Sequence, residues 1–274
     1  MAAPVVGSEL TEGERWSREQ LAALLAARFS PPAIGRFLLA SQRRADAVRA
    51  ARPELGRQAW TWMAVGGGSW LGLAAVGVEP FRCRWRSGLA WWATTAVMLD
   101  WHLGMAETLD GRPRPLGGAD ALTLLRAWLV PVALEDPTPA VCALAAVTDV
   151  LDGRLARASE PTRIGRDLEG LVDACFGAAA LRAALRRGLV APAVVGAELA
   201  RLTAGFGYAL YVYFARLSAP DPRVTQAGRV TTPMRAAGLV AAGLRRRRLA
   251  NVLLGGGAGW SVAAVARALR RAPA

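Results

Sequence analysis

Regularly spaced carboxylates make residues 148–173 the part of this chain that could do chemistry. Asp149 and Asp152 stand three residues apart, and Glu169 and Asp173 stand four apart. On α-helices these intervals place each pair on one helical face. The joint between the pairs is short and contains a proline, so we expect two antiparallel helices whose acidic faces meet.

Four convergent carboxylates need a reason to stay together. In a membrane helix a single acid costs on the order of 2.5 to 3.5 kcal/mol, and carboxylates that share a site repel one another. A divalent cation removes that repulsion. Because the set offers oxygen ligands and no His or Cys, Mg²⁺ or Mn²⁺ is preferred over zinc. The alternative is that the acids pair with neighbouring arginines at the membrane surface, namely Arg154, Arg157, Arg163 and Arg166.

The same stretch resembles the signature of the CDP-alcohol phosphotransferase family. That signature reads D-x-x-D-G-x-x-A-R, a gap of usually eight residues, and then G-x-x-x-D-x-x-x-D. The matching residues in this chain are Asp149, Asp152, Gly153, Ala156, Arg157, Gly165, Glu169 and Asp173. Two departures stand out, because Glu169 replaces the third aspartate and the gap is one residue shorter.

Two further stretches are similar to this family. Residues 120–126 read DALTLLR and look like the N-x-L-T-x-x-R start of its first helix, with Asp120 in place of the asparagine. Residues 227–232 look like the G-K-x-K-T stretch before its fifth helix, with Arg229 and Val230 in place of the lysines. The resemblance covers about residues 117 to 270, and it implies a six-helix bundle.

The resemblance also implies an activity, which is transfer of a substituted phosphate from a CDP-linked lipid to an alcohol with release of CMP. By resemblance, Asp149, Asp152 and Glu169 hold one or two divalent ions, while Asp173 helps to hold metal and acts as the general base. We expect the substrate to contact further residues of the module. These are Gly153, Ala156, Arg157, Thr162, Arg163, Gly165, Arg126 and Arg229.

The expected donor is CDP-diacylglycerol. The acceptor is glycerol phosphate, an inositol phosphate or phosphatidylglycerol. Glycerol phosphate is favoured because the Thr-Arg-Ile-Gly stretch at 162–165 is most similar to the phosphatidylglycerophosphate synthase branch. Two alternatives stay open: a degenerate, inactive member that results from Glu169, and a non-enzymatic transporter or scaffold. The family resemblance also implies a homodimer.

Composition favours a membrane protein. The chain has 274 residues, 53% of them hydrophobic, and a net charge of +13. This excludes a disordered chain, and the apolar residues lie in blocks separated by arginine-rich joints. Every basic residue is an arginine, a side chain that binds phosphate well. Long apolar blocks make lipid headgroups the expected partner rather than nucleic acid.

The elements that must position the site follow from these blocks. A bilayer needs roughly 20 apolar residues per helix. Candidate spans are 58–78, 87–106, 120–135, 137–152, 167–186, 189–216, 232–244 and 248–268. We therefore expect an all-α, polytopic membrane protein in three parts. These are an amphipathic, arginine-rich arm at 1–57, an extra hairpin and linker at 58–116, and the transferase module at 117–274. Within the arm we expect a helix break at residues 30–32 (Ser-Pro-Pro), and the proline- and glycine-rich residues 109–118 read as a joint.

The topology stays open at this point. Basic joints near residues 154–166 and 216–235 suggest the cytoplasmic side, whereas strict alternation places Arg82 and the run at 245–248 on the other side. Either one span is miscounted or the positive-inside rule, by which basic loops face the cytoplasm, is locally violated. Within the hairpin we expect the tryptophans to anchor at the membrane interface and the glycine run at 66–68 to let helices approach closely.

Overall fold

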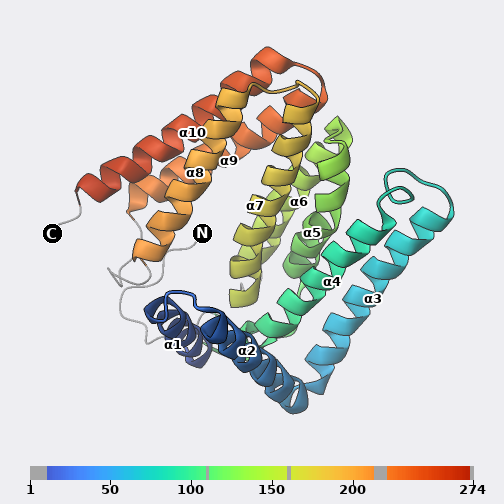
Figure 1. Ribbon diagram of the computed structural model, residues 1–274, viewed down its shortest axis with the longest axis vertical. Helices are drawn as coiled ribbons and strands as arrows, with labels where there is room; N and C mark the ends of the chain where they lie inside the picture. Colours follow the sequence, from blue (N-terminus) through green and yellow to red (C-terminus); the bar gives the residue numbers. More distant parts are fainter. Residues whose placement is uncertain (1–10, 109–110, 159–161, 213–220, 272–274) are drawn as a thin grey trace. The chain divides into compact units, whose positions relative to one another are not determined.

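The computed structural model describes residues 11–108, 111–158, 162–212 and 221–271, apart from the side chains of 156, 157 and 165–167. The fold is all-α, as expected: the described residues form ten α-helices, one short 3-10 helix and no strand (Figure 1). They divide into two compact units. Unit 2 comprises Ser8–Trp128 and Val150–Val172, and unit 1 comprises Leu129–Asp149 and the chain from Asp173 on.

The arm consists of two helices in unit 2. Helix α1 (Glu12–Ala26) begins at Thr11, whose hydroxyl accepts a hydrogen bond from the Glu14 amide at 3.3 Å. Helix α2 (Pro31–Ala51) begins with two prolines, which suit the first helical turn because an N–H group there has no partner within the helix. The break between the helices falls where the sequence predicts it.

The hairpin is formed by α3 (Pro53–Ala75) and α4 (Trp85–His102). Trp70 of α3 packs over Gly88 of α4, and Trp92 of α4 packs over Gly66 of α3. Both indoles are buried, with exposed fractions of 1% and 7%. The prediction that the tryptophans anchor at an interface is therefore wrong for these two, whereas the prediction of close helix approach is confirmed at Gly66 of the glycine run.

Polar contacts tie the arm to the hairpin. Arg49 of α2 contacts Asp46 and also Asp100 of α4. The hydrogen bond to the Asp100 carboxylate raises the pKa of Arg49. The 3-10 helix η1 (Leu103–Met105) follows α4, and the linker begins after it.

Helices α5 (Gly118–Glu135), α6 (Pro139–Ala158) and α7 (Arg163–Arg186) follow the linker, and each crosses from one unit to the other. In unit 2, an apolar cluster joins the start of α5 and the start of α7 to the hairpin and linker. Its buried members are Leu55, Ala59, Met63, Trp92, Leu99, Leu103, Ala106, Leu116, Leu124, Ile164 and Leu168. The extra N-terminal elements thus share one core with the first turns of the module.

In unit 1, helices α8 (Pro192–Tyr211), α9 (Pro222–Gly243) and α10 (Arg247–Arg270) pack together (Figure 1). Glu198 of α8 is fully buried and pairs with Arg201 at 2.8 Å and with Arg235 of α9 at 2.8 Å. The turn between α5 and α6 has no arginine of its own, but Arg187 pairs with its Asp136 at 2.9 Å. The positive charge of Arg187 therefore offsets the negative charge of Asp136 in this turn.

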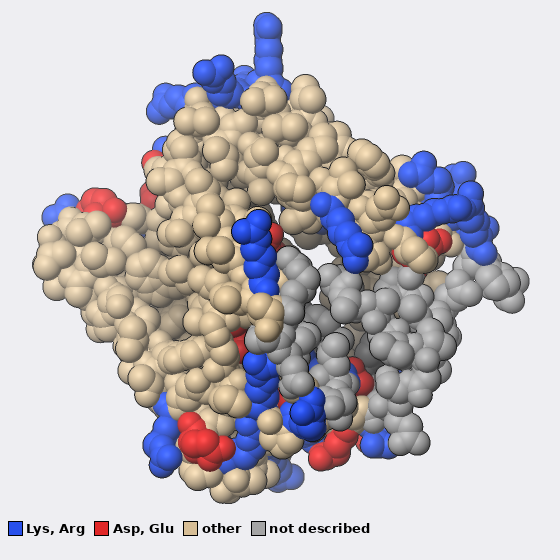
Figure 2. All heavy atoms as spheres, turned by 180° about the vertical axis from the view of Figure 1, so that it is seen from behind, with Lys and Arg blue, Asp and Glu red and all other residues tan. Residues whose placement is uncertain are grey.

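One helix of the described residues, α10, is long and apolar enough to cross a membrane. The other expected spans coincide with helices as far as the chain is described, but they do not meet the same test of length and composition. On the face drawn in Figure 2, arginine side chains gather in separate groups, and several of these groups lie beside Asp or Glu side chains. The multi-pass arrangement and the three-part division of the chain stay predictions.

Candidate metal centre

Three of the four expected carboxylates form a compact group. Asp149 and Asp152 on α6 and Glu169 on α7 each offer one oxygen, and these oxygens lie within 4.8 Å of one another. Asp152 and Glu169 belong to the same compact unit, and Asp149 lies one turn before Asp152 on the unbroken helix α6. The spacing of three residues thus places both aspartates toward Glu169, as the sequence predicts.

Asp173 is placed less directly. It lies one turn beyond Glu169 on α7 and is half-buried. The described carboxylates grouped within 4.8 Å do not include it. Its roles as metal ligand and general base stay predictions.

The group has the chemistry of a hard-cation site. All three potential ligands are carboxylate oxygens, with Asp152 buried and the other two side chains half-buried. Partial burial strengthens the repulsion between like charges. Oxygen-only ligand sets suit Mg²⁺ or Mn²⁺ better than zinc. The residues therefore fit the expected ion.

Asp152 is supported by two side chains of α5. Arg126 Nη1 lies 2.5 Å from Asp152 Oδ2, and the Thr123 hydroxyl donates to the same oxygen at 3.3 Å. Arg126 is only 2% exposed. We expected Arg126 to contact substrate, and the structure places it against a carboxylate of the candidate metal site. The i, i+3 spacing of Thr123 and Arg126 was the signal that could have predicted this shared role.

A second contact links α5 to the start of α7. Asp120 accepts a hydrogen bond from the Thr162 hydroxyl at 3.0 Å and another from the Gly117 amide at 2.7 Å. Thr162, expected at the substrate, is buried directly before α7. Asp120, which replaces the family's usual asparagine, therefore joins the two helices that flank α6 in sequence.

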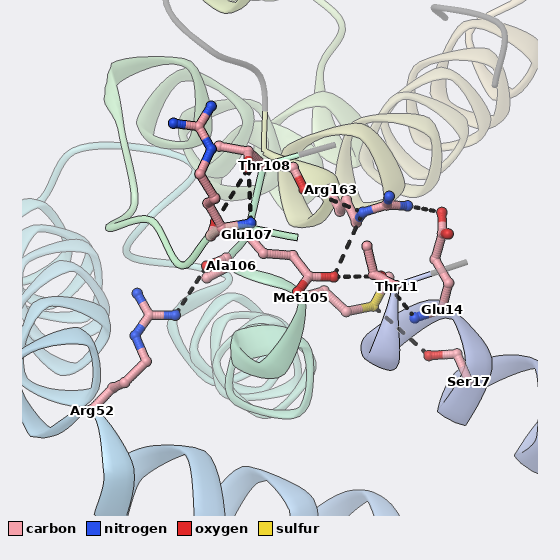
Figure 3. Close-up of polar contacts among 10 residues, drawn as sticks. Thr11, Glu14, Ser17, Arg52, Met105, Ala106, Glu107, Thr108 and Arg163 are labelled. Carbon is pink, nitrogen blue, oxygen red and sulfur yellow. Dashed lines mark hydrogen bonds and ion pairs between the residues drawn. The ribbon is translucent and has the colours of Figure 1, made fainter. Parts of the chain in front are cut away.

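Arg163 is the first residue of α7, and its side chain is buried (Figure 3). It forms ion pairs with Glu14 of the arm and, at 3.6 Å, with Glu107 of the linker. We expected this guanidinium either at a substrate phosphate or beside the site carboxylates. Sequence reasoning missed Glu14 and Glu107, and no local spacing could have indicated them because both are far from Arg163 along the chain.

The remaining expected residues are placed in part. Gly153 is half-buried on α6, and Arg229 is exposed on α9 in unit 1. The surroundings of Ala156, Arg157 and Gly165 lie outside the described part of the structure. Substrate contacts by these five residues stay predictions.

Comparison with known proteins shows the family of this chain. The model of the CDP-alcohol phosphatidyltransferase family matches residues 118–264, more than half of the chain. Searches of curated proteins and of solved structures found no match. The matched stretch contains all three grouped carboxylates, and the family's members are transferases of phospholipid biosynthesis. The chain belongs to the CDP-alcohol phosphatidyltransferase family.

Proposed function

We propose that this protein is a multi-pass membrane enzyme that transfers a phosphatidyl group from CDP-diacylglycerol to an alcohol and releases CMP. The observation that carries the proposal is the carboxylate group of Asp149, Asp152 and Glu169 within a chain of this family. We place the active site near the cytoplasmic face of the membrane. Glycerol phosphate is our favoured acceptor, in line with the phosphatidylglycerophosphate synthase branch.

Asp149, Asp152 and Glu169 would hold the divalent ion. When bound, the ion would neutralise negative charge that develops on the departing phosphate. Arg126 and Thr123 hold the Asp152 carboxylate from α5. Because these contacts already hold the Asp152 carboxylate in place, it need not reorganise during the reaction. Such preorganised groups stabilise the transition state more than the bound substrate.

The reaction is a displacement at phosphorus. The acceptor hydroxyl oxygen forms a bond to the phosphorus that carries the diacylglycerol. The bond between that phosphorus and the oxygen bridging to CMP breaks, and CMP leaves with the bond's electron pair. The hydroxyl proton passes to the Asp173 carboxylate, which must lie within hydrogen-bond reach of the attacking oxygen, and from there to water.

The direct test measures CMP release by the purified full-length protein in lipid and detergent. CDP-diacylglycerol, Mg²⁺ or Mn²⁺ and glycerol phosphate should give CMP, and Asp173→Asn should abolish its release. The matched control is Glu19→Gln, because Glu19 is an exposed acid on α1. If an active preparation keeps full turnover after Asp173→Asn, the assigned base is wrong.

The acceptor needs its own experiment. We expect mass spectrometry of the lipid product to show phosphatidylglycerophosphate when glycerol phosphate is supplied. A product only with an inositol phosphate or with phosphatidylglycerol would reassign the acceptor. The absence of CMP and lipid product with every acceptor would favour a degenerate member or a non-enzymatic membrane protein.

A further inference from the structure

We infer that the N-terminal arm, which lies outside the matched family region, positions the candidate metal site through Arg163. Glu14 and Glu107 hold this arginine at the first residue of α7, and α7 carries Glu169 six residues further on. We call these three residues the Arg163 clamp. Glu14 and Glu107 are positioning residues in this account. The inference rests on the proposed function, and it names an additional requirement of that site.

The arm reaches the clamp through polar contacts at the start of α1 (Figure 3). Glu14 pairs with Arg163, and the Thr11 hydroxyl donates to Glu107 Oε1 at 2.7 Å. Because Thr11 also caps α1, the same residue fixes the helix end and the linker carboxylate. The arm therefore provides one partner of Arg163, Glu14, and contacts the other, Glu107.

The linker is held from its other side as well. Arg52, between α2 and α3, donates to the carbonyl oxygens of Ala106 at 3.0 Å and Arg114 at 2.8 Å. Backbone hydrogen bonds then extend the linker to α7, since the Arg163 amide donates to the Glu107 carbonyl at 3.0 Å. The linker, which the sequence suggests is a simple joint, is therefore held by hydrogen bonds from Arg52 and from the first residue of α7.

From the clamp, contacts continue to the metal carboxylates. Thr162 joins α7 to Asp120 of α5, and Arg126 on the same helix contacts Asp152 of α6. Ile164 and Leu168 stand one turn apart on α7, and both are buried in the apolar cluster shared with the hairpin. All of these residues belong to unit 2. One compact unit thus joins the arm to two of the three carboxylates.

The burial of Arg163 gives the clamp its effect. Its side chain is 5% exposed and that of Glu14 is 15% exposed. A buried guanidinium that loses a carboxylate is left with uncompensated charge, and the structure around it must move to let water in. Here the group that would move is the first turn of α7. Residues that orient metal ligands typically change metal affinity or activity 10- to 100-fold when they are replaced.

The test replaces Glu14 by Gln in the full-length protein. We expect the Mn²⁺ concentration for half-maximal CMP release to rise about 10-fold, and Mn²⁺ binding measured by electron paramagnetic resonance to weaken by a similar factor. Glu14→Asp, which keeps the charge, should restore most of the affinity. Glu12→Gln is the matched control: Glu12 shares the first turn of α1 but is exposed and pairs with Arg44 at 3.2 Å. It should leave both values unchanged.

A second variant tests the same clamp independently, in case Glu14→Gln does not fold. Glu107→Gln removes the other carboxylate of the clamp and should weaken Mn²⁺ binding in the same direction. Amide hydrogen exchange in the first turn of α7 should become faster in both variants. A merely structural loss would instead lower the amount of folded protein without changing the Mn²⁺ affinity of the folded fraction, and that result would overturn the inference.

Two other results would also overturn it. One is an unchanged Mn²⁺ affinity and unchanged exchange of α7 in Glu14→Gln. The other is a lower KM for CDP-diacylglycerol in that variant, because Glu14 would then compete with substrate phosphate for Arg163. If the wild-type protein releases no CMP, the proposed function fails, but Mn²⁺ binding and hydrogen exchange still test the clamp.

Discussion

At the scale of single residues, Glu169 is where this chain departs from its family at the centre of the site. The longer side chain moves the carboxylate by about 1.5 Å relative to an aspartate, the length of one carbon–carbon bond. The structure nevertheless brings a Glu169 oxygen within 4.8 Å of those of Asp149 and Asp152. Glutamate has the same ligand type and charge as aspartate, so our proposal keeps Glu169 as a metal ligand.

This gives a prediction for position 169. Glu169→Asp should retain or raise CMP release, because it restores the family's usual side chain. Glu169→Gln should lower it at least about 10-fold, since a ligand charge is lost. The assay is CMP release over a range of Mg²⁺ concentrations. A complete loss in Glu169→Asp would show that the site is adjusted to the longer side chain.

The residues of the site differ in how far sequence could predict them. Asp149 and Asp152 share a face because they stand three residues apart on one helix, and their approach to Glu169 follows from the short joint that predicts two antiparallel helices. The surroundings of Arg163 do not follow from spacing. Glu14 meets Arg163 only because the arm folds back on the linker, and a single sequence carries no local record of such a distant ion pair.

At the scale of elements, the α3–α4 hairpin depends on glycines under indole rings. A Cβ at Gly88 would overlap the ring of Trp70, which is 1% exposed. A Cβ at Gly66 would likewise overlap the ring of Trp92. The hairpin therefore packs through two reciprocal glycine–tryptophan contacts.

Gly88→Ala should consequently destabilise the protein by about 1 to 3 kcal/mol, the usual effect of overpacking a core. Gly68→Ala is the control, because Gly68 is an exposed glycine of α3 with no atom within 4 Å of an added Cβ. That substitution should stabilise by roughly 0.5 to 1 kcal/mol through helix propensity. Thermal unfolding in detergent gives both shifts. Equal behaviour of the two variants would contradict the packing described.

In unit 1 the corresponding feature is the buried carboxylate of Glu198 between Arg201 and Arg235. Glu198→Gln would leave two arginines without their shared counter-charge, and it should cost about 3 to 5 kcal/mol. Asp136→Asn is a suitable comparison, because Asp136 forms a half-exposed pair with Arg187 and should cost less than about 1 kcal/mol. Denaturant unfolding measures both. A small loss for Glu198→Gln would show that the pair is dispensable.

The elements themselves were the most predictable part of the fold. Apolar blocks and prolines placed the helices well, including the break between α1 and α2. The interface prediction is wrong for Trp70 and Trp92, because an amphipathic ring suits either a membrane interface or a packed glycine surface. Which of these two environments a tryptophan occupies depends on how the partner helix packs against it, and the local sequence does not specify that packing.

At the scale of the whole molecule, the family region and the extra N-terminal elements are interleaved. Unit 2 combines the arm, hairpin and linker with the first turns of α5 and α7 and the last turns of α6. The sequence predicts these as successive parts along the chain. Buried side chains of the hairpin and linker share one apolar cluster with the first turns of α5 and α7, so these extra elements pack against the same helices that carry Arg126 and Glu169.

The account rests on a divalent ion held by Asp149, Asp152 and Glu169, and Mn²⁺ titration of the purified protein by electron paramagnetic resonance tests this most directly. We predict saturable binding by the wild-type protein, weakened at least about 10-fold in Asp149→Asn, Asp152→Asn and Glu169→Gln. The exposed-acid control Glu19→Gln should bind as the wild type does. Wild-type affinity in all three site variants would contradict the account.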